Sequence, residues 1–313
     1  MSKRASVPGM AVRETLRLLM HTPMMKNGGI FREHKLLSNF HWRPPRGYRV
    51  EKIQNGEFPM EMLSRGNKQH DKVILQLHGG AYLIALSDLY RIFAYRFCKA
   101  GGGAGVLTID YRIAPRYQHP AALNDALSAW KWLRSNGYLP QNIIVTGDSA
   151  GGNLALALTL QLRDWKEELP NSLILMSPWA DMTGSGDSRK FNYEKDPLFG
   201  KCAGDKTAES IRAPGNPYAG NHDLTDKYLS PVFGEYDGFP PMLIQVGGWE
   251  MLLSEARTVA EHARAAGVNV TLTEYPGMFH VFQALCDLLP ESRRAWREID
   301  DFIQEQFGIT TSS

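Results

Sequence analysis

Residues 142–158 have the sequence NIIVTGDSAGGNLALAL, which predicts a short buried strand, an abrupt turn and an apolar helix. The turn spells G-x-S-x-G, with Ser149 at its centre. In this pattern the serine sits on a strained strand-to-helix turn, and the glycines let the two elements pass closely while Oγ projects into a cleft. The bare pattern is common, but a strand before it and a helix after it make Ser149 a candidate nucleophile.

A serine hydroxyl needs donors for an oxyanion and a base to activate it. The apolar strand predicted at residues 71–78 ends in His78, which is followed by Gly79 and Gly80. A glycine pair at the end of a strand lets backbone N–H groups approach a ligand oxygen closely. We therefore expect an oxyanion hole from the N–H groups of Gly79, Gly80 and Ala150. A tight turn around a packed histidine is the alternative.

His78 and Asp148 flank these donors and the nucleophile in the sequence. We assign both to supporting structure around the turn rather than to chemistry. The same two stretches thus supply the nucleophile, the oxyanion donors and their support.

Strands and helices alternate along most of the chain. Strands are expected at residues 48–53, 58–64, 71–78, 105–111, 143–146, 172–177, 241–247 and 269–275, with helices at 11–25, 93–100, 123–136, 252–266 and 293–307 and after Ser149. The first two strands form an antiparallel pair. The rest predict an α/β fold with a mostly parallel, doubly wound, eight-stranded sheet.

Ligand chemistry in such a sheet gathers beyond the carboxyl ends of the strands. Glu250 and His280 follow the last two predicted strands, so the chain order is Ser149, Glu250, His280. That is a nucleophile, acid and base order typical of one class of serine hydrolase. Glu255 and Asp237 compete with Glu250, but Glu255 falls inside a predicted helix and Asp237 precedes its strand.

Together these pieces resemble the hormone-sensitive-lipase-like branch of the α/β-hydrolases, the bacterial family IV carboxylesterases. The matching pieces are His78-Gly79-Gly80, Asp110-Tyr111-Arg112 with Ala114-Pro115, Pro120-Ala121-Ala122 with Asp125, residues 147–152, Ser177-Pro178-Trp179 and residues 277–280. Two positions depart from the family pattern. Ala81 stands where the family usually has a third glycine, and Glu250 stands where it usually has aspartate in a D-P-L context.

The resemblance implies hydrolysis of short- to medium-chain acyl esters through an acyl-enzyme, without cofactor or metal. It also implies a helical cap over an α/β-hydrolase core. We expect the cap from residues 1–45 and 184–226, and the core from residues 46–183 and 227–313. Tyr82 and Trp249 are the expected substrate-binding residues.

Composition fits a globular enzyme: 43% of the 313 residues are hydrophobic, 22% are charged and the net charge is +2. Nothing in it indicates nucleic-acid binding or membrane insertion, and no signal-peptide core follows the N-terminus. Cys98, Cys202 and Cys286 are too few and too scattered for a disulfide framework or a zinc site. We expect a cytoplasmic monomer, or a homodimer formed through the strand at residues 269–275.

Two other readings stay open. Plant hormone receptors related to this fold keep the serine turn and lose the histidine, so a non-catalytic small-molecule receptor is one alternative. An amidase, peptidase or lactonase is the other, because the same groups can cleave those bonds.

Overall fold

The computed structural model describes residues 5–20, 42–66, 70–201, 211 and 216–309. Its centre is an eight-stranded sheet in the order β1-β2-β4-β3-β5-β6-β7-β8. The strands are β1 (Tyr48–Asn55), β2 (Phe58–Arg65), β3 (Val73–Leu77), β4 (Gly105–Ile109), β5 (Ile143–Asp148), β6 (Ser172–Met176), β7 (Met242–Gly247) and β8 (Val270–Tyr275). β2 pairs antiparallel with both β1 and β4, and every later pairing is parallel. The predicted fold class is confirmed.

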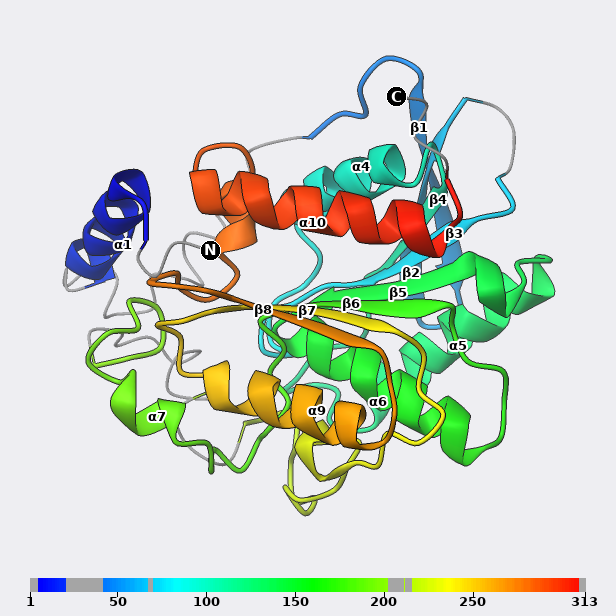
Figure 1. The fold of residues 1–313 in the computed structure, drawn as a ribbon. Helices are drawn as coiled ribbons and strands as arrows, with labels where there is room; N and C mark the ends of the chain where they lie inside the picture. Colours follow the sequence, from blue (N-terminus) through cyan, green and yellow to red (C-terminus); the bar gives the residue numbers. More distant parts are fainter. Residues whose placement is uncertain (1–4, 21–41, 67–69, 202–210, 212–215, 310–313) are drawn as a thin grey trace.

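Helices cover both faces of the sheet (Figure 1). They are α1 (Val7–Met20), α4 (Asp88–Ala100), α5 (Ala121–Ser135), α6 (Ala150–Asp164), α7 (Ser188–Phe191), α9 (Leu253–Ala265) and α10 (Pro290–Gln306), with short 3₁₀ turns at Pro140–Asn142, Pro231–Phe233 and Phe282–Leu285. α4 and α10 lie on one face, and α5, α6 and α9 lie on the other. This is the doubly wound arrangement that the alternation predicts.

Three helices begin three or more residues earlier than predicted. α4 begins at Asp88, five residues early, with an acidic residue in its first turn that suits the helix dipole. α10 begins at Pro290, because proline fits the first helical position, where its missing N–H is not needed. α1 begins at Val7, and residues 21–25 of the predicted first helix lie outside the described residues.

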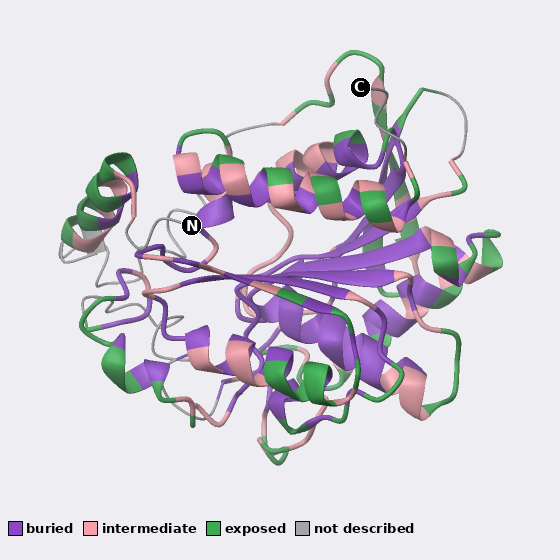
Figure 2. Cartoon of the chain, viewed as in Figure 1, coloured by how far each residue is buried: buried purple, intermediate pink, exposed green. Residues whose placement is uncertain are grey.

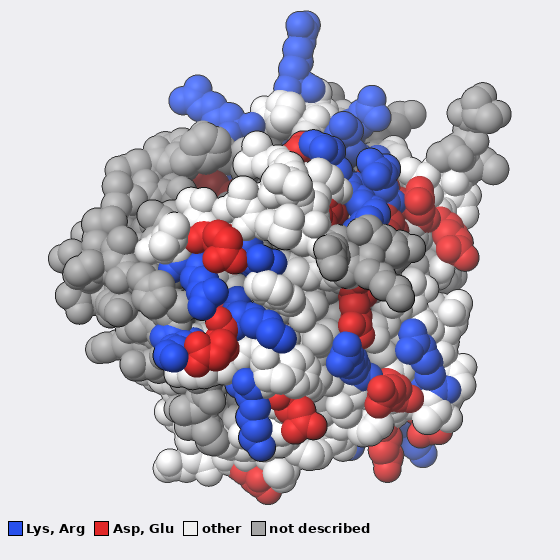
Figure 3. All heavy atoms as spheres, turned by 60° about the vertical axis from the view of Figure 1, so that its left-hand side comes forward, with Lys and Arg blue, Asp and Glu red and all other residues white. Residues whose placement is uncertain are grey.

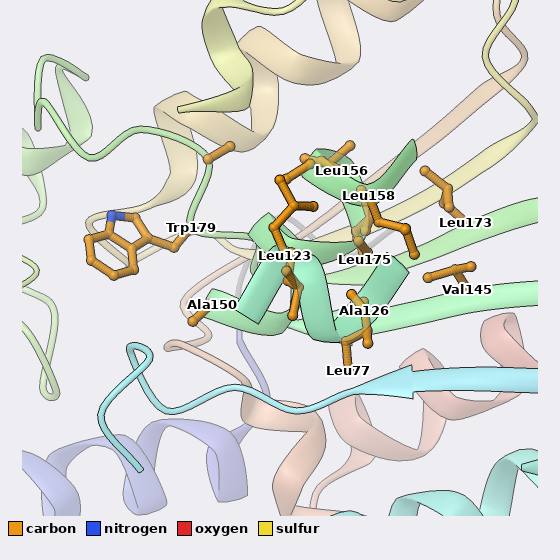
Figure 4. Packing of buried hydrophobic residues seen from close by; sticks show 14 of the residues in the cluster. Leu77, Leu123, Ala126, Val145, Ala150, Leu156, Leu158, Leu173, Leu175 and Trp179 are labelled. Atoms are coloured by element: carbon orange, nitrogen blue, oxygen red, sulfur yellow. The ribbon is translucent and has the colours of Figure 1, made fainter. Parts of the chain in front are cut away.

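The central strands β3, β4, β5, β6 and β7 are buried on both faces, and the helices mainly where they meet the sheet (Figure 2). On one face, side chains such as Ile74, Val106 and Ile144 pack against Phe93 and Trp296 of α4 and α10. On the other face, alternate strand residues pack against side chains of α5 and α6 (Figure 4). The strand and helix residues labelled in this cluster are Leu77, Leu123, Ala126, Val145, Ala150, Leu156, Leu158, Leu173, Leu175 and Trp179. This double burial explains why the central strands are continuous apolar runs.

The strands β3, β5, β6, β7 and β8 run parallel, so their carboxyl ends meet at one edge of the sheet. α1 and α7 lie beyond that edge, at the left of Figure 1. In the view turned to bring this side forward, basic and acidic side chains are interspersed (Figure 3). Along the described ranges, no helix combines the length and apolar character that crossing a bilayer requires.

Candidate active site

Ser149 occupies the sharp turn between β5 and α6, as the motif predicts. Its backbone angles are φ 52° and ψ −119°, a strained conformation for a residue with a side chain. The flanking glycines are forced by close approach: a Cβ on Gly147 would lie 2.1 Å from the carbonyl oxygen of Gly151, and one on Gly151 would lie 2.1 Å from that of Leu77. The turn therefore holds Ser149 in one geometry at the edge of the sheet.

The predicted acid and base are in direct contact. Glu250 follows β7 and its side chain is wholly buried, while His280 follows β8 and is 6% exposed. Nδ1 of His280 lies 2.8 Å from Oε2 of Glu250. A buried carboxylate on Nδ1 orients the imidazole and leaves Nε2 for chemistry.

The competing acids lie elsewhere. Glu255 is inside α9, where its carboxylate pairs with Arg189 at 3.0 Å. Asp237 is exposed and precedes β7. Of these three carboxylates, Glu250 is the one bonded to His280.

Asp148 links the nucleophile turn to the loop after β3. Its Oδ1 accepts the N–H of Gly79 at 3.1 Å, and its Oδ2 accepts the Tyr90 hydroxyl at 3.1 Å. Burial raises the pKa of Asp148 to about 6, and the charge of His280 acts in the opposite direction. The residue beside Ser149 thus lies within electrostatic range of His280.

The backbone N–H groups around the expected oxyanion hole differ in whether they already have a hydrogen-bond partner. The N–H of Gly79 is already bonded to Asp148 and, at 2.9 Å, to the Tyr90 hydroxyl. Gly80 and Ala81 have φ of 109° and 55°, and within the described part of the chain their N–H groups have no hydrogen-bond partner. Ala150 is the first residue of α6, so its N–H has no hydrogen-bond acceptor within the helix. The free donors are therefore Gly80, Ala81 and Ala150.

His78 contacts the loop that follows β3. Its ring stacks on Tyr111 with centroids 4.1 Å apart, and its Nδ1 lies 2.8 Å from the carbonyl oxygen of Gly79. The imidazole is wholly buried and contacts the loop that carries Gly79 and Gly80.

Tyr82 and Trp249, the expected substrate-binding residues, both contact other side chains of the protein. The Tyr82 side chain is 1% exposed, stacks on Tyr218 at 3.8 Å and donates to Asn153 at 2.7 Å. The indole of Trp249 lies under the guanidinium of Arg13, 3.6 Å from its ring centroid. It lines a cavity of about 550 Å³ between α1, α7 and α9 whose lining residues do not include Ser149, Glu250 or His280.

Residues of the insertion hold the acid loop from outside. Asn192 donates from Nδ2 to the carbonyl oxygen of Glu250 at 3.0 Å, and Asp196 accepts the N–H of Met251 at 2.8 Å. Asp196 also accepts the N–H groups of Leu198 and Phe199. Both polar side chains are buried, so the insertion and the acid loop are one packed unit here.

Two polar residues that contact the acid or its loop were given no role from the sequence. Asp196 begins an Asp196-Pro197-Leu198 stretch, which is the D-P-L context usual for the family acid, yet its carboxylate bonds to backbone N–H groups. Ser177 follows β6 and donates to Glu250. The signal for Ser177 was present, because it is a polar residue at the carboxyl end of a buried strand.

A strained serine at the carboxyl edge of a parallel sheet, where a buried acid–histidine pair follows two other strands, is typical of a serine hydrolase. The family model described as "alpha/beta hydrolase fold" matches residues 74–284. The chain belongs to that family, and within it to the hormone-sensitive-lipase-like group of carboxylesterases.

Relatives agree with this placement. An acetyl-hydrolase of Streptomyces hygroscopicus is 36% identical over 244 residues, which cover 78% of this chain and 79% of that protein. A solved esterase from the bacterial hormone-sensitive lipase family shares 33% identity with a TM-score of 0.84, covering 98% of this chain and 100% of its own. The esterase EstE5, in crystals soaked with p-nitrophenyl butyrate, shares 32% identity with a TM-score of 0.85 over 97% of this chain and 100% of its own.

Proposed function

We propose that this carboxylic ester hydrolase acts through an acyl-enzyme on Ser149, with His280 as base and Glu250 as acid. His280 takes the proton of Ser149 as Oγ attacks the ester carbonyl, and Glu250 stabilises the imidazolium that forms. His280 then returns the proton to the leaving alcohol. Water, activated by His280, then attacks the acyl-enzyme and releases the carboxylic acid from Ser149. Protein groups and water supply every step.

The observation that carries this proposal is the 2.8 Å contact between buried Glu250 and His280, on the edge where the strained turn holds Ser149. The Gly80, Ala81 and Ala150 N–H groups supply the oxyanion hole. Each such donor is worth about 3 kcal/mol of transition-state stabilisation in enzymes of this kind. The alanine at position 81 serves as well as the family glycine, because the donor is a backbone group.

The substrate we propose is a small ester with a short- to medium-chain acyl group. The acetyl-hydrolase relative and the p-nitrophenyl butyrate used with EstE5 support short acyl groups. We infer that residues 1–45 and 184–226 form the cap that limits acyl length, over a core of residues 46–183 and 227–313. The contact of Phe199 with His280, at 4.6 Å between ring centroids, supports this for the insertion.

We further propose a cytoplasmic monomer or homodimer. The two cysteines in the described ranges, Cys98 and Cys286, are free thiols, as a reducing compartment favours. Cys202 lies outside the described residues.

The test is hydrolysis of p-nitrophenyl esters from acetyl to palmitoyl, with a p-nitroanilide of the preferred acyl group alongside. We expect turnover to peak at short or medium chains, and Ser149→Ala to abolish it while leaving the circular dichroism spectrum unchanged. Glu250→Gln should lower kcat by several orders of magnitude, because it cannot stabilise the imidazolium. Faster cleavage of the anilide would favour an amidase, and the absence of turnover by folded wild type would favour the receptor.

A further inference from the structure

Ser177 connects the acid of the proposed triad to the loop that carries the base. Its Oγ lies 2.8 Å from Oε1 of Glu250, to which it donates, and accepts the N–H of Val281 at 3.2 Å. A hydroxyl can donate once and accept at the same time, so both bonds coexist. One buried side chain therefore bridges the carboxylate and the residue next to His280.

The carboxylate oxygen that faces away from His280 has two donors. Oε1 of Glu250 accepts from Ser177 and from the N–H of Gly247, while Oε2 faces the imidazole. Glutamate has one more rotatable bond than aspartate, so its carboxylate needs more fixing to hold one orientation. The Ser177 hydroxyl is the side-chain donor that supplies it.

The backbone of Ser177 gives independent support. Its φ is 48°, in the left-handed region, where a side chain is strained and glycine is not. The neighbouring strand holds the residue there through a 2.7 Å bond from its N–H to the carbonyl oxygen of Gln245. Glycine would adopt this backbone conformation without strain. The feature that serine has and glycine lacks at this position is the hydroxyl group.

We propose that Ser177 is a positioning residue for catalysis, which sets the orientation of Glu250 and the place of the His280 loop. This inference rests on the proposed function, because it concerns the same triad. The Ser177 hydroxyl contacts Glu250 and the N–H of Val281, so it acts through these groups. Its removal takes a donor from the charged carboxylate, so protonation of the acid–base pair becomes easier.

Ser177→Gly is the sharpest test, because glycine suits the backbone and removes only the hydroxymethyl group. We expect kcat for p-nitrophenyl butyrate to fall about tenfold or more with KM within about twofold of wild type. We also expect the acidic limb of the pH profile of kcat/KM to move to higher pH. Ser177→Ala, which also lacks the hydroxyl, gives the decisive reading if the glycine variant yields no folded protein.

The matched control is Ser230→Ala, which removes another buried serine hydroxyl, one that accepts the N–H of Met182. We expect it to lower the unfolding midpoint without moving the acidic limb. A folded Ser177→Gly enzyme with wild-type kcat and an unmoved limb would overturn the inference while leaving the proposed function intact. The proposed function itself fails separately, if Ser149→Ala retains turnover.

Discussion

The ring of Phe199 packs against the imidazole of His280, with centroids 4.6 Å apart and planes inclined by 59°. Phe199 belongs to the insertion and is 6% exposed, so a buried residue of the proposed cap contacts the proposed base His280. The insertion and the chemical machinery are therefore coupled by direct packing.

Phe199→Ala should lower kcat/KM as well as the free energy of unfolding. Removing the ring opens a cavity beside His280, and losses of this kind cost about 3–5 kcal/mol in a rigid core. We expect kcat/KM for p-nitrophenyl butyrate to drop at least about tenfold, and Phe199→Leu to recover most of it. Equal kcat/KM in the alanine variant and wild type would show that the ring does not support the base.

Asp196→Asn should weaken the link between the insertion and the acid loop. The carboxylate accepts three backbone N–H groups, and an amide replaces one acceptor oxygen by a donor that faces an N–H. We expect a loss of about 2–3 kcal/mol in the free energy of unfolding, measured by urea denaturation. The exposed Asp237→Asn is the control, and an equal effect of the two substitutions would contradict the account.

Much of this arrangement was predictable because the signals are local. The strand order along the chain, the G-x-S-x-G turn and the Glu250–His280 positions follow from apolar periodicity and from residues at strand ends. These features depend on neighbours in the sequence, so the sequence pattern records them directly.

The parts that could not be predicted depend on partners distant in the chain. A glycine pair offers two N–H groups, and only the contact of Gly79 with Asp148 and Tyr90 decides which one is occupied. Likewise, Trp249 turns toward Arg13 because α1 brings a guanidinium to that loop. Side-chain direction at such positions is set by tertiary packing, which leaves no periodic signal.

The raised pKa of Asp148 predicts that the free energy of unfolding depends on pH. Its pKa is about 6 in the folded protein and 3.8 as its ordinary value, so the folded state binds the proton more tightly. The stability from this group is therefore fully present below about pH 4 and is lost as the pH rises through 6. Relative to Asp148→Asn, wild type should lose about 2 kcal/mol of unfolding free energy between pH 4 and 7.

Urea denaturation of both proteins at several pH values measures this difference. Substitution at exposed Asp237, by asparagine, serves as the control and should show no such trend. A difference between wild type and Asp148→Asn that stays flat, or grows, with rising pH would contradict the assignment.

Arg189→Met should destabilise the junction between α7 and α9. Arg189 and Glu255 form a buried ion pair at 3.0 Å, with both side chains less than a tenth exposed. Burial raises the pKa of Glu255 to about 8 and the charge of Arg189 acts against that rise, so removing the guanidinium leaves a buried carboxyl group without one of its hydrogen-bond partners. Such a loss costs about 1–3 kcal/mol. The double variant Arg189→Met with Glu255→Leu should regain most of that loss, because it removes both polar partners.

A double-mutant cycle on unfolding free energies tests this pair. The exposed pair Lys201–Glu194 at 2.9 Å is the matched comparison, and we expect its coupling to be at most about 1 kcal/mol. Equal coupling at the two sites would contradict the role of burial.

The central claim is that Ser149 is the nucleophile activated by His280 and Glu250. Its most direct test is peptide mass spectrometry after treatment with phenylmethylsulfonyl fluoride, comparing wild type with His280→Ala and Glu250→Gln. We predict a single sulfonyl adduct on the peptide containing Ser149 in wild type, strongly slowed labelling in both variants, and loss of esterase activity in step with labelling. An adduct on a different residue, or full activity after Ser149 is labelled, would contradict the account.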